Sequence, residues 1–318
     1  MTSPVAAVVG QLARDLVLSV DAVPDAGDAG DATGRREQLG GKGANQAVAL
    51  AQLGVRPRLV AVAGDDVIGD VLLDQARRDG IDVTAVLRRR ATLTGLIVEL
   101  LDADGGWRYV QHLPDAVLLT ERDIESARDV IAGADAVLVQ LQQPSAAALA
   151  ASRIGHDAGR LVVLDGVPEE RRDDLLAVAD VIRADDKEAK LLLGDEPTVE
   201  NAQRLLDQGP RLLALGVGDG NLFVWRDGHL RLPLTDEKVV DTTGGGDAFT
   251  AALTASLLRG EDPATAARWA VAASGATVGH PSGRPDLRTA DLEKRVAELA
   301  TTADTTVVRT REGELGSE

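Results

Sequence analysis

Short apolar runs alternate with helical patterns along most of this 318-residue chain. Each run is long enough for one buried strand, and the segments between the runs carry helical periodicity. Strands that alternate with helices form βαβ units, because a parallel strand returns to its sheet only through a crossover connection. The pattern therefore predicts an α/β fold, a three-layer α/β/α sandwich with a mainly parallel central sheet. The apolar runs are residues 5–9, 59–63, 137–139, 161–164, 181–183 and 212–215.

Three of the expected helices have recognisable ends. The first is rich in Ala and Leu and should end at Gly54, a glycine C-cap. Asp65 is expected to cap a second helix that runs to about Arg78. The pair Asp262-Pro263 is typical of an N-cap followed by the first helical position, and it should open a third helix.

Two regions interrupt the alternation of strands and helices. They are residues 16–38, which include a turn-rich segment, and residues 92–113, in which two β-type runs flank Asp104-Gly105-Gly106, a hairpin turn. We expect segments from about 12–38 and 92–113 to form a small β-sheet lid over the carboxyl ends of the main sheet, where open α/β folds bind ligands. The alternative is an edge hairpin with no role as a lid.

Composition excludes several classes of function. The chain carries 51 acidic and 34 basic residues, a net charge of −17, which disfavours nucleic acids and anionic membranes as partners. It has no cysteine, so disulfides and thiolate chemistry are excluded. No signal peptide or long apolar run is evident, and we expect a soluble, cytoplasmic protein. A single domain should span residues 1–301, and the polar segment 302–318 is expected to be a disordered tail.

Three consecutive glycines, Gly244, Gly245 and Gly246, precede a helical pattern. Glycines at a helix N-terminus let several backbone N–H groups point one way, which makes a cradle for an anion such as a phosphoryl group. Asp247 follows at the entry to the helix, where a carboxylate can accept the proton of an attacking hydroxyl. The alternative is that Asp247 only caps the helix.

A second glycine-rich segment, Gly40 to Ala47, also precedes a helical pattern. Its glycines allow a substrate to approach the backbone, and the amide of Asn45 can both donate and accept hydrogen bonds. The segment is not a Walker A loop, because Lys42 is followed by Gly43 rather than Ser or Thr.

Together the two segments resemble the signatures of the ribokinase-like (phosphofructokinase B type) carbohydrate kinase family. Residues 241–247 are similar to its D-T-x-G-A-G-D signature, with Gly245 where the family more often has Ala, and residues 40–45 read GGKGAN, as in the ribokinase branch. The resemblance implies a ribokinase-like sandwich and transfer of the γ-phosphoryl group of ATP to a hydroxyl, expected to be a primary one, of a sugar or sugar-like substrate.

The resemblance also implies roles for individual residues. Asp247 would be the catalytic base, and Gly244, Gly245 and Gly246 the anion hole. The substrate would contact Gly41, Lys42 and Asn45. Asp241 and Thr243 match positions that help bind a monovalent cation, commonly K⁺, in several members of the family.

Two departures from the family pattern concern the substrate. Near the N-terminus the family reads G-x-x-N-x-D, whereas this chain keeps Asp15, expected to bind sugar hydroxyls, but has Ala13 for the asparagine. Gln142 stands where ribokinases carry a sugar-contacting glutamate. Because of these changes, the identity of the acceptor is left open.

Residues on the nucleotide side match the family less well. Glu188 is retained from an N-x-x-E motif and would organise Mg²⁺ through water, while Asp185 replaces the asparagine near the nucleotide phosphates. The alternative for this pair is a solvated acidic helix start. Gly216 and Gly220 lie where relatives place a turn that borders the ATP site, although they suit a hairpin equally well.

The sequence therefore predicts a carbohydrate kinase that uses ATP and Mg²⁺, and the resemblance implies K⁺ as a further cofactor. A homodimer is expected, because lid strands often pair between subunits in the family. Alternative acceptors are a nucleoside, a sugar acid or a sugar phosphate. An alternative of another class is a sugar-binding regulatory protein without catalysis, favoured by Ala13, Gln142 and Asp185.

Overall fold

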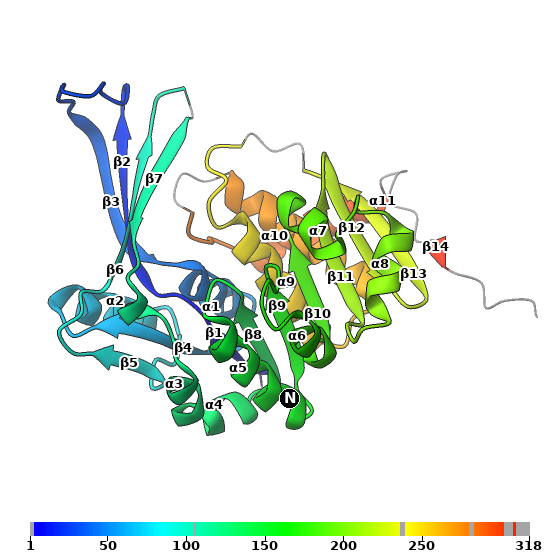
Figure 1. The fold of residues 1–318 in the computed structure, drawn as a ribbon. Coiled ribbons are helices and arrows are strands. Elements are labelled where there is room, and N and C mark those ends of the chain that lie inside the picture. The colour runs from blue at the N-terminus through cyan, green and yellow to red at the C-terminus, as the bar shows by residue number, and fades with distance from the viewer. Residues whose placement is uncertain (1–2, 105, 236–238, 280–282, 302–307, 310–318) are drawn as a thin grey trace, which may run out of the picture.

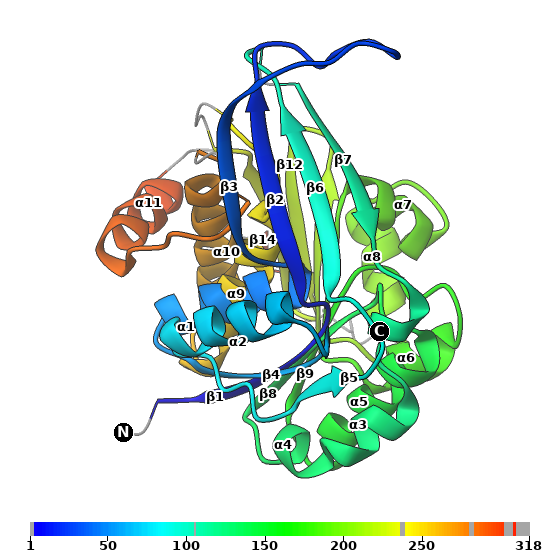
Figure 2. The ribbon, with the colours of Figure 1, turned by 90° about the vertical axis from the view of Figure 1, so that its left-hand side faces the viewer.

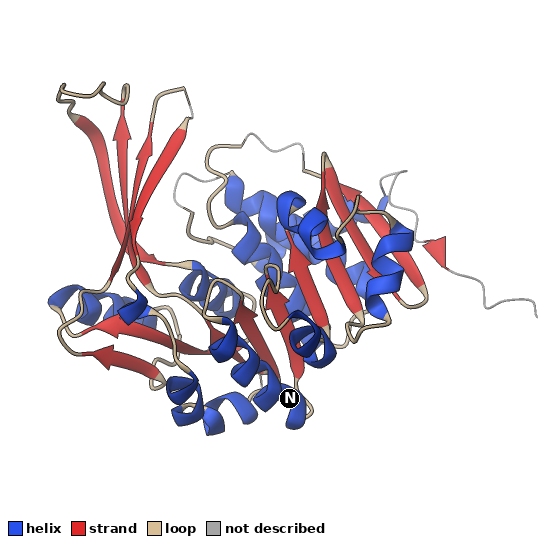
Figure 3. Ribbon diagram, in the orientation of Figure 1, coloured by secondary structure: helices blue, strands red, loops and turns tan. Residues whose placement is uncertain are grey.

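A computed structural model of the chain describes residues 3–104, 106–235, 239–279, 283–301 and 308–309. It contains a ten-stranded central sheet and a separate four-stranded sheet that rises from one end of it (Figures 1 and 3). The strands of the central sheet run, in spatial order, β14 (Val308–Arg309), β13 (Gly228–Pro233), β12 (Gly220–Trp225), β11 (Leu212–Val217), β10 (Val181–Ala184), β9 (Leu161–Asp165), β8 (Ala136–Gln140), β1 (Val5–Val9), β4 (Arg56–Gly64) and β5 (Val86–Arg89).

The central sheet is mainly parallel, as the sequence predicts. Every described pairing from β5 to β11 is parallel, and the remaining pairings, from β11 to β14, are antiparallel. All five residues of β1 are buried, which is expected of a strand covered on both faces.

Helices cover both faces of this sheet, so the predicted three layers are present. Alternate residues of β1 separate into two hydrophobic cores: Ala6 and Val8 into one, and Val5, Ala7 and Val9 into the other. The helices of the first core are α1 (Lys42–Gln52), α2 (Val67–Arg78), α9 (Gly245–Leu258), α10 (Pro263–Val278) and α11 (Thr289–Thr301). Those of the second core are α3 (Glu121–Ser126), α4 (Arg128–Ala132), α5 (Ser145–Asp157), α6 (Arg172–Val178), α7 (Asp186–Leu193) and α8 (Val199–Leu206). A short 3₁₀ turn, η1 (Asp115–Val117), precedes α3.

The four-stranded sheet, called the small sheet below, contains both segments that interrupt the βαβ pattern. Its order is β3 (Ala32–Gly40), β2 (Ala13–Val20), β6 (Gly95–Leu101) and β7 (Trp107–His112) (Figure 2). β6 and β7 pair antiparallel, which confirms the predicted hairpin. β2 begins where the chain leaves the carboxyl end of β1, so the small sheet grows out of the edge at which α/β folds bind ligands.

The predicted helix ends are confirmed with one correction. Gly54 follows α1 with φ of +81°, and Asp262 caps α10 through the N–H groups of Ala264 and Thr265. The cap of α2 is Asp66 rather than Asp65: its carboxylate accepts hydrogen bonds from the N–H of Gly69. The same side chain also accepts two hydrogen bonds from Thr94, which ties α2 to the start of β6 and explains why the second aspartate is used.

The predicted tail, 302–318, lies outside the described residues except for the two that form β14. Those two pair antiparallel with β13. Within the described part of the chain, no helix combines the length and the apolar character needed to cross a membrane.

Candidate active site

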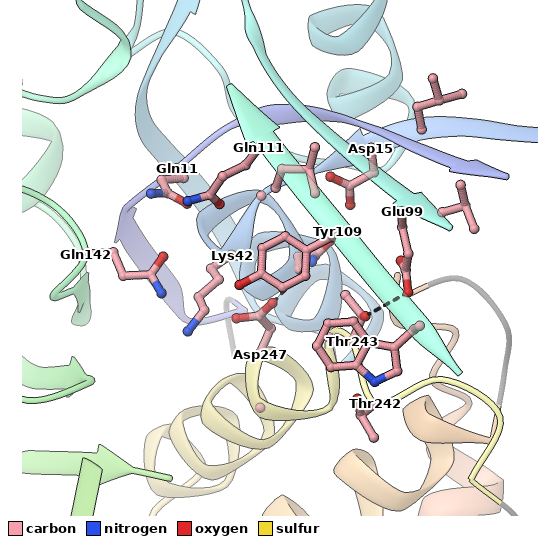
Figure 4. A pocket seen from close by; sticks show the side chains of 18 of the residues that line it. Gln11, Asp15, Lys42, Glu99, Tyr109, Gln111, Gln142, Thr242, Thr243 and Asp247 are labelled. Atoms are coloured by element: carbon pink, nitrogen blue, oxygen red, sulfur yellow. Dashed lines mark hydrogen bonds between the residues drawn. The ribbon is translucent and has the colours of Figure 1, made fainter. Parts of the chain in front are cut away.

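One cavity of about 360 Å³ lies between the small sheet and the carboxyl ends of the central strands (Figure 4). It brings together most of the residues that were predicted from the sequence to bind the substrate, the nucleotide or a cation. The predicted residues that line it are Asp15, Gly41, Lys42, Asn45, Gln142, Asp185, Thr243, Gly244, Gly246 and Asp247. Gly245 and Asp241 are chain neighbours of this lining and are not part of it.

The glycine loop forms the N-terminus of α9. Gly244 is the N-cap residue with φ of +73°, and no side chain of the described residues caps the helix there. The N–H groups of the first turn are therefore left for another acceptor, as a cradle for an anion requires. Asp247 lies within the first turn and does not cap it, so the alternative of a capping aspartate is wrong.

Asp247 is buried, with 5% of its surface exposed, and the amide of Asn45 holds it. Asn45 Nδ2 donates to Asp247 Oδ2 over 3.1 Å, and Gln46 Nε2 lies 3.4 Å from Oδ1. Burial raises the pKa of Asp247 to about 7, opposed by Lys42 and reinforced by the charge of Asp165. A carboxylate with a pKa near neutrality is suited to general-base catalysis.

Asp165 and Arg183 form a buried ion pair next to Asp247, and neither residue was predicted from the sequence. Arg183 Nη1 lies 3.2 Å from Asp165 Oδ1, and Asp165 Oδ2 accepts a hydrogen bond of 2.7 Å from Gln46 Nε2. The guanidinium of Arg183 lies against Gly246, and its pKa is raised through Asp165 and Glu188 despite the opposing effect of burial. The polar residue at the end of an apolar strand was the available signal for Asp165.

Asp15 enters the cavity from β2. Its carboxylate occupies the space where a side chain at position 40 would stand, so only glycine fits there. Burial and the charges of Asp247 and Glu99 raise the pKa of Asp15 to about 7, while a hydrogen bond from the N–H of Gly41 lowers it. Asp15 Oδ1 is buried and has no hydrogen-bond partner within the described residues, which leaves it able to accept from a ligand hydroxyl.

Glu99 lies on β6, and its side chain reaches Thr243 beside the glycine loop. It was not among the residues predicted from the sequence. Thr243 Oγ1 lies 3.5 Å from Glu99 Oε1, the contact dashed in Figure 4. Burial and the charge of Asp241 raise the pKa of Glu99 to about 7. Asp241 is itself buried: its Oδ1 accepts from the N–H of Thr243, and its Oδ2 has no partner among the described residues. An acidic residue in an otherwise apolar strand run was the signal for Glu99.

Gln142 and Lys42 lie on the side of the cavity away from Glu99 (Figure 4). Gln142 Oε1 accepts a hydrogen bond of 3.1 Å from Gln140 Nε2, and Gln140 Oε1 accepts from the N–H of Gln11. Lys42 and Gln142 also line a neighbouring cavity of about 330 Å³, which contains Glu188.

Asp185 and Glu188 form a capping box at the start of α7. Asp185 Oδ1 accepts from the N–H groups of Lys187 and Glu188, and Glu188 Oε2 accepts from the N–H of Asp185. This geometry agrees with the alternative of an acidic helix start. The other oxygens, Asp185 Oδ2 and Glu188 Oε1, take no part in the box and leave each carboxylate able to bind further.

Gly216 and Gly220 belong to the hairpin of β11 and β12, as the alternative for them stated. They also line a third cavity of about 200 Å³, which shares Arg183 and Asp185 with the cavity that contains Asp247. Gly216 and Gly220 can therefore belong to the hairpin and also border a ligand site.

Gly244→Ala is expected to destabilise the chain by at least about 2 kcal/mol, because a left-handed non-glycine residue is strained and its Cβ would overlap the carbonyl oxygen of Gly283. Urea unfolding measures the loss. Gly260→Ala is the matched control, since Gly260 has φ of +78° and open space around it. An equal loss in both variants would show that the contact with Gly283 has no influence.

A free helix N-terminus and a buried carboxylate at one cavity meet the requirements of phosphoryl transfer to a hydroxyl, namely charge stabilisation and a proton acceptor. The sequence matches the pfkB family carbohydrate kinase over residues 5–290. The chain therefore belongs to the pfkB family of carbohydrate kinases.

Relatives and solved structures agree with this family and with the predicted ribokinase-like fold. An ATP-dependent ribose-1-phosphate kinase of Halopiger xanaduensis is 32% identical over 281 residues, 86% of this chain and 92% of the relative. A bifunctional ribokinase/ribose-5-phosphate isomerase A of Fructilactobacillus sanfranciscensis is 30% identical over 258 residues, 79% of this chain. The matched part is 48% of that longer relative. The structure of Arabidopsis thaliana ribokinase complexed with ribose and ATP superimposes with a TM-score of 0.75 at 24% identity, covering 95% of this chain and all of the other.

Proposed function

We propose that this chain phosphorylates a hydroxyl, expected to be primary, on a sugar or sugar-like acceptor with ATP as donor, and that Asp247 is the general base. The hydrogen bond of 3.1 Å between Asn45 and Asp247 carries the proposal. It joins two motifs that stand 202 residues apart in the chain, at a buried carboxylate beside a free helix N-terminus.

The residues around Asp247 would each have a separate role in the reaction. Asp15 would accept hydrogen bonds from the acceptor, as would the amides of Asn45 and Gln142, and Gly41 would allow the acceptor to approach the backbone. Asp247 would take the proton from the attacking oxygen. The N–H groups of the loop from Gly244 to Gly246 would stabilise charge on the transferred group without rearrangement.

The nucleotide and its metal fit the residues next to this cavity. ATP supplies the phosphoryl group when bound, and Gly216, Gly220 and Asp185 border the cavity that would hold it. Glu188 would help hold Mg²⁺ through water, since it keeps one carboxylate oxygen outside the capping box, and Asp185 would lie near the nucleotide phosphates. The buried and unpartnered Asp241 Oδ2, with Thr243 beside it, suits a monovalent cation such as K⁺.

We propose that the small sheet acts as a lid that excludes water when the acceptor binds. It already forms one wall of the cavity through Asp15 and Glu99.

The opposite face of the small sheet presents the half-buried apolar side chains of Leu18, Val98 and Leu100. Pairing of two such faces would make the expected homodimer.

The direct test is ADP release with ATP, Mg²⁺ and K⁺ against a panel of pentoses, hexoses, nucleosides, sugar acids and sugar phosphates. Turnover stimulated by one class of acceptor would support the proposal. Acceptors that bind without any ADP formation would overturn it in favour of a non-catalytic binding protein.

The value of kcat/KM is expected to rise with pH through about 7 and then level off. Asp247 must be ionised to accept a proton, and its raised pKa of about 7 places the protonated form below that pH. Asp15 titrates in the same range and the two charges are coupled, so Asp15→Asn should shift the acidic limb to lower pH. A rate that does not change between about pH 5.5 and 8.5 would contradict the assignment of the base.

A further inference from the structure

Aromatic residues are rare in this chain, and two of them lie exposed in the wall of the cavity. The sequence has three Trp, one Tyr and two Phe. Trp107 and Tyr109 stack with ring centroids 5.6 Å apart and planes 10° from parallel, yet they are 43% and 53% exposed. The two phenylalanines, Phe223 and Phe249, instead stack inside the buried core. Packing therefore does not explain the first pair.

The fold points this aromatic pair at the proposed acceptor site. Strand residues alternate between faces, so Trp107 and Tyr109 share a face of the small sheet with Glu99, which pairs directly with Tyr109. Both rings line the cavity that contains Asp247. Figure 4 shows the ring of Tyr109 inside this cavity, between Lys42 and Glu99. Stacking of the two rings leaves one face of each ring free for a planar ligand.

The charges beside the rings oppose an anionic acceptor. Asp15 and Glu99 line the wall formed by the small sheet, whereas the cationic residues lining this cavity are Lys42 and Arg183. Arg183 is paired with Asp165, and Lys42 acts on Asp247. Above about pH 7, where Asp15 and Glu99 are ionised, a phosphate or carboxylate group placed beside the rings would therefore meet like charge. Glu99, whose contact with Thr243 is long at 3.5 Å, is an acceptor for ligand N–H groups.

We propose that the acceptor is a nucleoside, a ribosyl compound whose flat nitrogen ring stacks on the free face of Tyr109, with Trp107 stacked on the other face, and donates a hydrogen bond to Glu99. This inference rests on the proposed kinase function. The sugar lies over Asp15, Asn45 and Asp247, and the base extends along the small sheet toward the rings. A free pentose leaves the aromatic pair without a partner, and a sugar phosphate places its charge against Glu99.

The first experiment compares ADP release with adenosine, inosine, uridine and cytidine against ribose, deoxyribose, ribose 1-phosphate and ribose 5-phosphate. At least one nucleoside should exceed all four sugars in kcat/KM by tenfold or more. A free pentose or a sugar phosphate as the best acceptor would overturn the inference while leaving the kinase intact. No stimulation by any acceptor would instead overturn the proposed function.

The second experiment measures the same kinetics in Trp107→Leu and Tyr109→Leu. Each change should lower kcat/KM for the preferred nucleoside roughly 5- to 150-fold, which corresponds to the ~1–3 kcal/mol that stacking of one base on an aromatic ring contributes. Val71→Thr is the control, because it alters an exposed apolar side chain of α2 that does not line this cavity. Equal losses in Val71→Thr, or undiminished nucleoside turnover without the rings, would overturn the assignment. Thermal unfolding of each variant excludes misfolding as the cause.

Discussion

Asp247→Asn is expected to lower kcat by about 10²- to 10⁴-fold while the acceptor still binds. The amide has the shape of the carboxylate and can still accept from Asn45, but it cannot take the proton of the attacking hydroxyl. Turnover of ADP gives the rate, and calorimetric titration with the preferred acceptor gives the affinity. Asp227→Asn, in the exposed turn between β12 and β13, is the matched control.

Asp247→Asn should also change how the stability of the chain depends on pH. A carboxyl whose folded pKa is raised from 3.8 to about 7 binds its proton more tightly in the folded state, so its contribution to stability falls as pH rises between these values. Asp247→Asn removes this dependence, and its stability relative to the parent should improve between pH 5 and pH 8 in urea unfolding. A kcat within tenfold of the parent enzyme would show that another group accepts the proton.

The local parts of the site could be predicted from the sequence because short-range chemistry determines them. A run of glycines before an apolar helical pattern indicates a helix N-terminus, and Gly244 does begin α9. The two motifs could be named separately, and their meeting through Asn45 and Asp247 follows from the packing of α1 against α9 on one face of the central sheet.

The missing parts depend on long-range packing. Arg183 lies in a strand run that reads as apolar, and its role becomes visible only when β9 brings Asp165 beside it. Glu99 reaches the glycine loop only because the small sheet rises over the carboxyl ends of the central strands. The choice of Asp66 over Asp65 likewise depends on Thr94, which is distant in sequence.

Asp165→Asn is expected to destabilise the chain by about 3–5 kcal/mol, the usual effect of removing one partner from a buried ion pair. The Asp165 side chain is 2% exposed and that of Arg183 17%, so solvent cannot replace the lost charge. Urea unfolding measures the change. Glu200→Gln breaks an exposed pair with Arg204 and should change stability by less than about 1 kcal/mol.

The double variant Asp165→Asn/Arg183→Met separates pairing from packing. Removing the orphaned guanidinium should recover part of the stability lost in the single variant, so the two changes should be less than additive.

The pH dependence of activity provides a second test of the same ion pair. In Asp165→Asn the charge of Asp165 no longer raises the pKa of Asp247, and Arg183, freed from its partner, lowers it further. The acidic limb of kcat/KM should therefore move below pH 7, and an unmoved limb combined with unchanged stability would show that the ion pair supports neither the fold nor the base.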